Sequence, residues 1–285
     1  MLIDTHAHVN FNAFKQDSGE VIRRSLDGSV NSPQVWMINV GSQYSTSKRA
    51  IEIAEKYEKG VYAAVGLHPI HLQTDLVKIK TDLKEIELKT REEEFDYNKY
   101  KILTRSKKVV AIGEIGLDYY YRPKTKRKLE LFKEKQKKAF LKQLDLAKEL
   151  NLPVIFHCRF AHDDLIEILN TQYQIQNTKL RGVIHCFTGN WDQAQKYMEM
   201  GFYLGLNGII FKLDLNEVIK KAPLEKILLE TDCPYLTPPQ EGKKRNEPSY
   251  IKYVAQRIAE IKDIDFEEVS QATTKSARKL FNMQI

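Results

Sequence analysis

No stretch of this 285-residue chain is apolar for the roughly 18–20 residues that a membrane-spanning helix needs. We expect no membrane association, and no secretion signal, because the first residues lack a basic segment followed by an apolar one. The three cysteines, which are Cys158, Cys186 and Cys233, are odd in number and far apart. They argue against a disulfide framework and favour a reducing compartment, for which we expect the cytoplasm.

Internal repeats, low-complexity segments and Pro/Gly-rich linkers are also missing, so we expect one domain over residues 1–285. Neither sign of charge dominates, since 45 Lys and Arg stand against 38 Asp and Glu, a formal net charge of +7. This excess mildly favours an anionic partner, although lysines on solvated helix faces account for most such excesses. With 42% hydrophobic residues, the chain can build a sizeable core.

Short apolar runs rich in Val, Ile and Leu alternate with longer, charged segments of helical periodicity. Such runs are typical of parallel strands that are buried on both faces. Eight strand–helix units in this length predict a (β/α)8 TIM barrel, an α/β fold, with an extra C-terminal helix. We expect strands at 2–6, 35–40, 61–67, 109–115, 153–157, 181–186, 201–206 and 226–231. We expect helices at 17–29, 45–58, 75–90, 126–150, 161–172, 191–200, 214–221 and 248–261, and the extra helix at 266–281. The charged segment 76–106 departs from this rhythm, and we expect a helix and a surface insertion there.

Most of the histidines directly follow a predicted strand, and the active site of such a barrel lies at the carboxyl ends of its strands. His6 and His8 should point to the same side, because residues two apart on an extended chain do. Five of the seven histidines and two acidic residues occupy these ends. They are His6, His8, His68, Glu114, His157, His185 and Asp232. We expect the other two, His71 and His162, at the surface or behind the site.

Imidazole and carboxylate groups gathered on one rim predict a centre for two divalent metal ions. Two ions about 3.5–4 Å apart need a bridging carboxylate and terminal imidazoles, and Glu114 is the natural bridge. Each residue alone is more simply a structural one, and their joint placement favours the metal site. The expected division is His6, His8 and Asp232 for one ion and His157 and His185 for the other.

Each cysteine directly follows one of these candidate ligands. We expect each thiol to face outward under the helices as a small buried side chain. Coordination of a metal by the thiols is the less favoured alternative, because the sequence has no C-x-x-C spacing.

Seven motifs make the chain similar to the TatD-type metal-dependent deoxyribonucleases, a family of the amidohydrolase-like barrels. They read IDTHAH (3–8), VGLHP (65–69), AIGEIGLDY (111–119), PVIFHCR (153–159), HCFTG (185–189), ETDCP (230–234) and RNEP (245–248). The resemblance implies the (β/α)8 fold, divalent metals and hydrolysis of DNA phosphodiester bonds, often from a 3′ end. It implies metal ligands at His6, His8, Glu114, His157, His185 and Asp232. The segment before the fourth strand is longer than usual, and Phe160 stands where the family commonly has a polar or acidic residue.

For the chemistry we expect Asp232 to orient a water and accept its proton. His68, which has no ion assigned to it, is expected to bind a phosphate oxygen or assist the leaving group. Arg159 would clamp phosphate, or else pair with Asp163 or Asp164. We expect Asp4, Asp118 and Glu230 to orient ligands or loops from behind.

The predicted substrate is DNA, single-stranded or at 3′ ends, and no protein partner is predicted. Bases would stack on Tyr119, Tyr120, Tyr121 or Phe187, which lie near the ends of the fourth and sixth strands. Two basic clusters would meet the phosphates, one at Arg122, Lys124, Lys126 and Arg127 and one at Lys243, Lys244 and Arg245. Cellular abundance and phosphoryl transfer favour Mg²⁺, whereas imidazole ligands would suit Zn²⁺ or Mn²⁺.

An alternative function is hydrolysis of a C–N or ester bond, including an aminoacyl ester on tRNA. Many amidohydrolase barrels carry a carboxylated lysine at the fourth strand, and Glu114 in that position disfavours this alternative. A binding protein with an inactive site is disfavoured as well, because every expected ligand is present.

Overall fold

A computed structural model of the chain describes residues 1–30, 32–72, 93–176 and 180–283. Eight strands form one sheet in sequence order, and all neighbouring strands are parallel. They are β1 (Leu2–Ala7), β2 (Val35–Val40), β3 (Val61–Val65), β4 (Val109–Asp118), β5 (Val154–Arg159), β6 (Gly182–Ile184), β7 (Tyr203–Leu206) and β8 (Ile227–Leu229).

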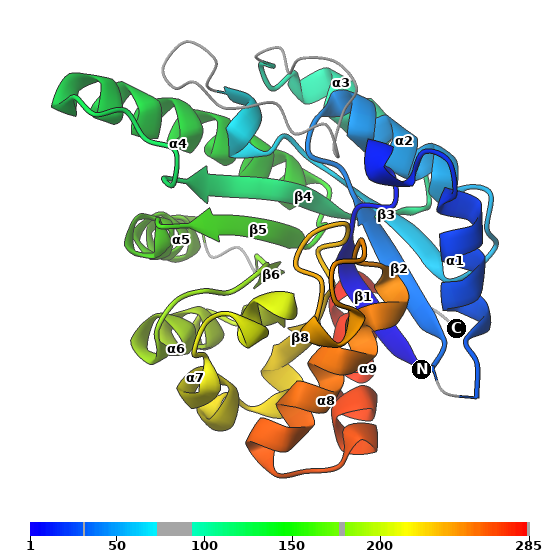
Figure 1. The fold of residues 1–285 in the computed structure, drawn as a ribbon. Coiled ribbons are helices and arrows are strands. Elements are labelled where there is room, and N and C mark those ends of the chain that lie inside the picture. The colour runs from blue at the N-terminus through cyan, green and yellow to red at the C-terminus, as the bar shows by residue number, and fades with distance from the viewer. Residues whose placement is uncertain (31, 73–92, 177–179, 284–285) are drawn as a thin grey trace.

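The sheet closes where β8 meets β1, just beyond the last residues of β8. Ala7 and Cys233 form a parallel bridge. The amide of Asp232 donates to the carbonyl of His6 at 2.8 Å, and the amide of His8 donates to the carbonyl of Cys233 at 2.9 Å. These contacts confirm the predicted (β/α)8 barrel, and Figure 1 shows the helices packed around its strands.

The helices follow the strands closely in the predicted places. They are α1 (Ser18–Asp27), α2 (Tyr44–Ala54), α3 (Tyr97–Leu103), α4 (Lys126–Glu149), α5 (His162–Gln176), α6 (Trp191–Glu199), α7 (Asn216–Lys221), α8 (Ile251–Lys262) and α9 (Phe266–Phe281). The helix predicted at 75–90 lies outside the described residues, and α3 occupies the end of the charged segment. In the described part of the chain, no helix is both long and apolar enough to cross a membrane.

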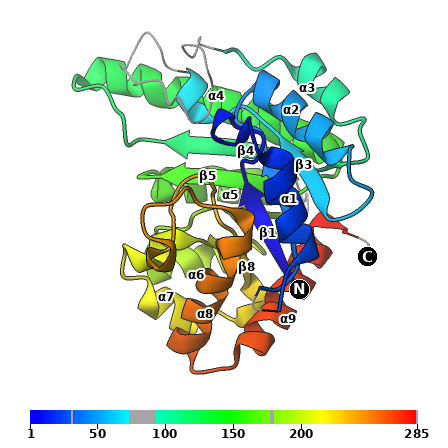
Figure 2. The ribbon, with the colours of Figure 1, turned by 45° about the vertical axis from the view of Figure 1, so that its right-hand side comes forward.

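The last helix, α9, closes the amino-terminal end of the barrel. Ser270 and Thr274 each donate a hydroxyl hydrogen bond of 3.0 Å to the carbonyl of Met1, next to β1. Figure 2 shows α9 beside the first residues of that strand. Apolar residues at the end of the chain pack against the side chains that fill the barrel, including Ile3, Trp36, Ile38, Val110 and Leu228. They are Ala277, Leu280, Phe281 and Met283.

A one-residue bulge turns functional side chains of β1 into the barrel. Pairing with β2 runs from Leu2 to Asp4 and resumes one residue out of step at Ala7. Ile3 packs inside the barrel before the bulge, whereas Ala7 packs outward under the helices after it. His6 and His8 therefore face inward, because side chains alternate along a strand and a bulge shifts that alternation.

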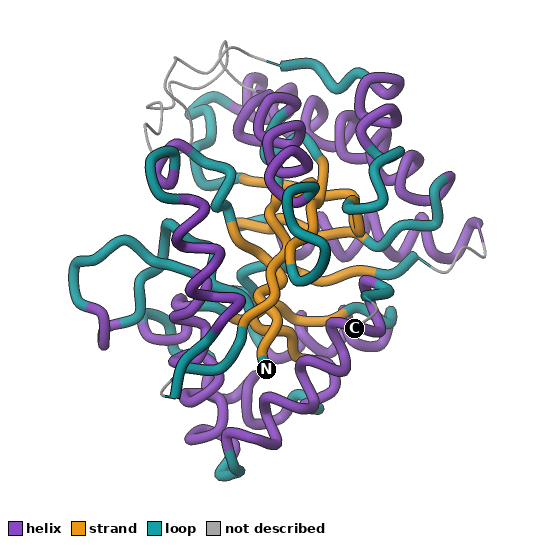
Figure 3. The backbone as a smooth tube through the Cα atoms, turned by 90° about the vertical axis from the view of Figure 1, so that its right-hand side faces the viewer, coloured by secondary structure: helices purple, strands orange, loops and turns teal. Residues whose placement is uncertain are grey.

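The strand β4 has a similar bulge between Gly113 and Ile115. Ala111 packs inside the barrel, while Ile115 and Leu117 pack under the helices. Glu114 and Asp118 consequently face inward, and without the extra residue Glu114 would point outward. The tube in Figure 3 shows the strands at the centre of the molecule with helices around them.

The packing of α9 predicts a large contribution to stability. Phe281 is 2% exposed, and its replacement by alanine removes a ring from the closed end of the barrel. We expect the free energy of unfolding to fall by about 3–5 kcal/mol, measured by denaturant titration. Leu213, which is 44% exposed, provides the control, because its replacement by alanine should cost less than about 0.5 kcal/mol. Equal stability of the two variants would contradict the proposed role of α9.

Candidate metal centre

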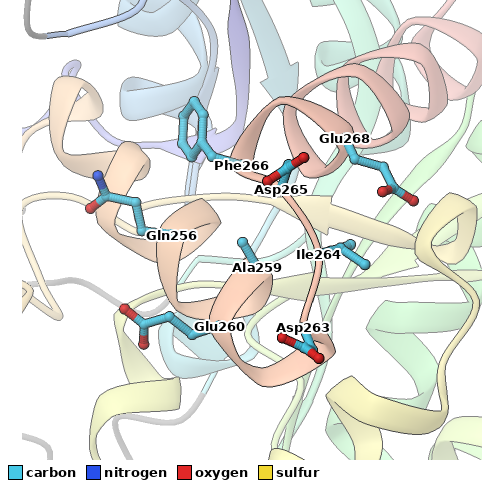
Figure 4. A pocket seen from close by; sticks show the side chains of 8 residues that line it. All are labelled: Gln256, Ala259, Glu260, Asp263, Ile264, Asp265, Phe266 and Glu268. Carbon is cyan, nitrogen blue, oxygen red and sulfur yellow. The ribbon is translucent and has the colours of Figure 1, made fainter.

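The predicted histidines and acids meet in a cavity of about 410 Å³. Its walls come from the carboxyl ends of the strands and the loops that follow them, and they include His8, His68, Glu114, His157, His185 and Asp232. His6 lies directly beneath and is fully buried. Another hollow, shown in Figure 4, lies where α8 turns into α9 and is lined by carboxylates such as Glu260 and Asp263 without a histidine. The cavity at the strand ends is therefore the candidate active site.

Glu114 is the centre of this cluster. Its Oε1 lies 2.6 Å from Nδ1 of His157, 3.5 Å from Nε2 of His68 and 3.7 Å from Nε2 of His185. Its Oε2 lies 3.5 Å from Nε2 of His6. Burial alone would raise the pKa of Glu114, but the surrounding imidazoles hold it well below its usual range. The carboxylate is thus ionised and has oxygens facing both sides of the cavity.

The donor atoms of His6, His8 and Asp232 fit a divalent cation. Nε2 of His6 and Nε2 of His8 are 3.1 Å apart, and Oδ1 of Asp232 lies 3.5 Å from the latter. Nδ1 of His8 must carry a proton, because it donates to the carbonyl of Val40 at 2.8 Å. In the neutral ring, Nε2 therefore presents a lone pair to the cavity. Lone pairs and a carboxylate gathered this closely are the environment that a cation neutralises.

His185 is held by a carboxylate behind it. Its Nδ1 lies 2.9 Å from Oε1 of Glu230, and that oxygen also accepts from the amide of Cys186 at 2.7 Å and from Nδ2 of Asn207 at 2.9 Å. A carboxylate on one imidazole nitrogen leaves the other free for a metal. Nε2 of His185 lies 3.8 Å from Asp232 Oδ1. Glu230 thus lies behind a candidate ligand, as expected.

His6, His8 and Asp232 lie together as expected, whereas His157 and His185 are not grouped with each other. The rings of His185 and His6 stack with centroids 3.4 Å apart, and these two residues form a candidate cation site with Glu114. His157 instead lies with His68 and Asp118. The spacing of residues in the sequence assigns each histidine to the end of a strand and no further. The neighbours of each ring also depend on how far its side chain extends across the barrel.

His157 is held between two carboxylates. Nδ1 faces Glu114, and Nε2 lies 3.0 Å from Oδ2 of Asp118. Burial lowers the pKa of His157, but the two carboxylates outweigh it and raise that pKa to about 9. The ring therefore carries two protons unless a cation takes the place of one of them. Asp118, like Glu230, lies behind a candidate ligand.

His68 differs from the candidate ligands in the proton that its ring carries. Its Nδ1 accepts a hydrogen bond of 3.0 Å from the amide of Ile70. The hydrogen of the neutral ring is therefore on Nε2, which faces Glu114 across the cavity. A nitrogen that carries a hydrogen cannot ligate a metal, whereas it can donate to an oxygen of a substrate. This agrees with the expectation that no ion is assigned to His68.

Arg159 stands at the mouth of the cavity and lines it. Its guanidinium carbon lies 3.6 Å from the centre of the Tyr120 ring. Among the described residues, the alternative pairing of Arg159 with Asp163 or Asp164 does not occur. Asp164 bonds instead to Tyr119 and to Lys133, and Asp163 accepts from Gln193. The positive charge of Arg159 is therefore available at the mouth.

Tyr119 does not reach the cavity. It is 4% exposed, and its hydroxyl donates to Asp164 at 2.8 Å. The alternation that turns Leu117 outward also turns Tyr119 outward under the helices, a signal already present in the sequence. The expected stacking of a base on Tyr119 is therefore not supported, and Phe187 is fully buried as well. Of the four aromatic residues that were expected to stack on bases, the exposed ones are Tyr120 and Tyr121.

Other expectations also need correction. Of the two places expected for His71 and His162, the surface is wrong, because they are 1% and 8% exposed, and a position behind the site remains. Cys158 and Cys233 are buried as expected, although Cys158 also borders the cavity. Cys186 is less buried, lines the cavity and forms a candidate cation cluster with His185 and Asp232. The left-handed backbone at Cys186 (φ 45°) interrupts the alternation that was expected to turn this thiol outward.

One of the two basic clusters is largely paired with acids. Arg245 binds both oxygens of Asp17, at 3.0 and 2.6 Å, and contacts Glu247. Lys244 pairs with Glu241 at 2.9 Å. These contacts join the loop after β8 to the segment before α1, so the predicted phosphate-binding role does not suit Arg245.

Comparisons with known proteins agree with this geometry. The family model described as TatD related DNase matches residues 3–282. The chain belongs to this family. It is 40% identical to the uncharacterized metal-dependent hydrolase YabD of Bacillus subtilis, over 99% of this chain and 100% of that protein. It is 31% identical to the 3′-5′ ssDNA/RNA exonuclease TatD of Shigella flexneri, over 99% of each chain. The crystal structure of YJJV, a TatD homologue from Escherichia coli, matches with a TM-score of 0.79 and 29% identity, covering 99% of this chain and 98% of the other. The protein is thus a metal-dependent hydrolase of the TatD family.

The central place of Glu114 predicts the effect of removing its charge. We expect Glu114→Gln to weaken binding of divalent ions by more than about 100-fold, since losing even an outer partner of a ligand costs 10–100-fold. Isothermal titration with Mn²⁺ measures the affinity. Glu130→Gln on the exposed side of α4 is the matched control and should bind like the wild type. Unchanged affinity in Glu114→Gln would show that this carboxylate holds no ion.

Proposed function

We propose that the protein is a divalent-metal-dependent nuclease that releases nucleotides from the 3′ end of single-stranded DNA, with residues 1–285 acting as one domain. The observation that carries the proposal is the placement of His68, a hydrogen-bond donor, beside the candidate metal ligands in a cavity that Arg159 also lines. A phosphodiester needs these groups together, because negative charge grows on its oxygens during hydrolysis. The exonuclease name of the Shigella relative supports the same substrate class.

In this proposal six residues would hold two divalent ions, and Glu114 would contribute to the binding of both. The ligands are His6, His8, Glu114, His157, His185 and Asp232. Bound ions would lower the pKa of a water and offset charge on the phosphate oxygens. Mg²⁺ is the proposed cellular metal, with Mn²⁺ or Zn²⁺ as substitutes that imidazole ligands favour.

Three side chains of the protein would accept a proton and bind the phosphates. Asp232 faces the cavity. Burial would raise its pKa, but the neighbouring histidines hold that pKa below its usual range. The carboxylate is therefore ionised and can accept a proton from the attacking water. His68 donates its Nε2 hydrogen to a phosphate oxygen or to the leaving oxygen. Arg159 binds the adjacent phosphate with its planar guanidinium.

The exposed basic residues after β4 favour a polyanionic substrate. Arg122, Lys124, Lys126 and Arg127 are exposed on the segment that leads from the cavity into α4. A row of cations that leads away from the cavity can contact successive phosphates of a nucleic acid. A small ester or amide has no such row of negative charges.

The proposed activity is tested with metal-stripped protein and single-stranded oligonucleotides labelled at either end. We expect no cleavage without metal, and release of 3′-terminal mononucleotides after Mg²⁺ or Mn²⁺ is added back. Dipeptide, lactone and aminoacyl-tRNA substrates are assayed in parallel. Hydrolysis of one of these with intact DNA in every metal would favour the alternative of C–N or ester hydrolysis.

The proposed role of His68 separates it from the ligand His8. We expect His68→Ala to lower kcat by about 100–1,000-fold, the usual cost of removing one donor to a developing anion, while the bound metal stays at the wild-type amount. His8→Ala should lose both metal and activity. Metal analysis and single-turnover kinetics of the two variants measure the difference, and metal loss in His68→Ala would make His68 a ligand.

A further inference from the structure

An exposed aromatic side chain follows β5 beside the cavity. Phe160 is 71% exposed and has a left-handed backbone, with φ of 55°. A phenylalanine gains little stability where water still covers most of its ring, and the left-handed region is unfavourable for a bulky side chain. Neither burial nor backbone conformation explains why a phenylalanine stands at this position. This indicates that the ring serves function rather than stability.

The ring of Phe160 continues a layer of flat groups that begins at the cavity. The guanidinium of Arg159 covers one ring, that of Tyr120, and Phe160 stacks on the same ring with centroids 5.7 Å apart and planes 29° apart. Tyr121 meets Tyr120 edge to face at 4.8 Å. We call Tyr120, Tyr121, Arg159 and Phe160 the aromatic platform.

The aromatic platform is continuous with the catalytic cavity. Arg159 and Tyr121 line that cavity together with the candidate metal ligands. Tyr120 is 47% exposed and Tyr121 is 43% exposed, so the rings present area to solvent at the mouth. A substrate with its reacting phosphate at Glu114 would extend over this layer.

We propose that the aromatic platform binds an unpaired base of the nucleic-acid strand whose phosphate enters the cavity, and that Phe160 is its outer stacking face. This inference rests on the proposed nuclease function and adds a substrate-selecting site to it. A base within a duplex has both faces covered by its neighbours, so only a single strand or a frayed end can offer one.

Charge complementarity favours this occupant over an apolar peptide. Arg159 belongs to the platform, and the exposed residues Arg122, Lys124 and Lys126 follow it directly along the loop after β4. Stacking faces beside backbone cations are the general means by which proteins hold single-stranded nucleic acids, and every base has a face to stack.

The test compares oligonucleotides that carry an abasic residue at each of the three 3′-terminal positions in turn. For the wild type, we expect kcat/KM to be about 5- to 150-fold lower when the abasic residue falls at the platform, from the usual strength of one base–aromatic contact. In Phe160→Asn the ratio between the intact and the abasic substrate should approach about one, because the stacking partner is gone. Asparagine tolerates a left-handed backbone, which protects the fold of this variant.

Two further variants make the result specific to the ring. Phe160→Trp should keep the wild-type ratio, and so should Ile102→Asn, which changes an apolar residue that is 54% exposed on α3. An unchanged ratio in Phe160→Asn, with normal cleavage of intact DNA, would overturn the platform and leave the nuclease function standing. If the wild type cleaves no oligonucleotide in any metal, the proposed function fails and the inference fails with it.

Discussion

The structure depends on one electrostatic constraint, which is the compensation of the buried carboxylate of Glu114. An ionised carboxylate with 5% exposure is costly unless positive charge or donors surround it. Imidazoles from β1, β5 and the segments after β3 and β6 supply that compensation, with His157 closest at 2.6 Å. In the proposed metal centre, divalent ions held by His6, His157 and His185 would add to that compensation, while His68 keeps its hydrogen. The group that is hardest to bury would then also be the carboxylate that binds the metals.

The barrel satisfies this constraint through small local features. Ordinary alternation along β3, β5 and β6 already turns the relevant side chains inward, whereas β1 and β4 need an extra residue to do so. Asp232, beyond the end of β8, has a left-handed backbone with φ of 55°. The closed end is filled by α9, which leaves the carboxyl ends of the strands as the open face. Stability and chemistry therefore occupy opposite ends of one barrel, as the fold class permits.

Much of this arrangement could be predicted from the sequence, because the apolar runs locate the strands and the polar residue after each run locates the rim. The neighbours of His185 and the place of Cys186 in the cavity wall could not be predicted in the same way. The neighbours of His185 depend on how far its side chain extends across the barrel, and the spacing of residues in the sequence carries no information on that distance. Tyr119 could have been placed by extending the alternation of β4 to Asp118, whereas Cys186 departs from alternation through a left-handed backbone.

The proposed metal centre is tested most directly by diffraction from crystals of the protein grown with Mn²⁺, using anomalous scattering to locate the ions. We expect two anomalous peaks about 3.5–4 Å apart in the cavity, both in contact with Glu114, one of them beside His6 and His8. The absence of anomalous density in the cavity, or peaks that do not touch Glu114, would contradict the central claim that this carboxylate is buried in order to hold a pair of cations.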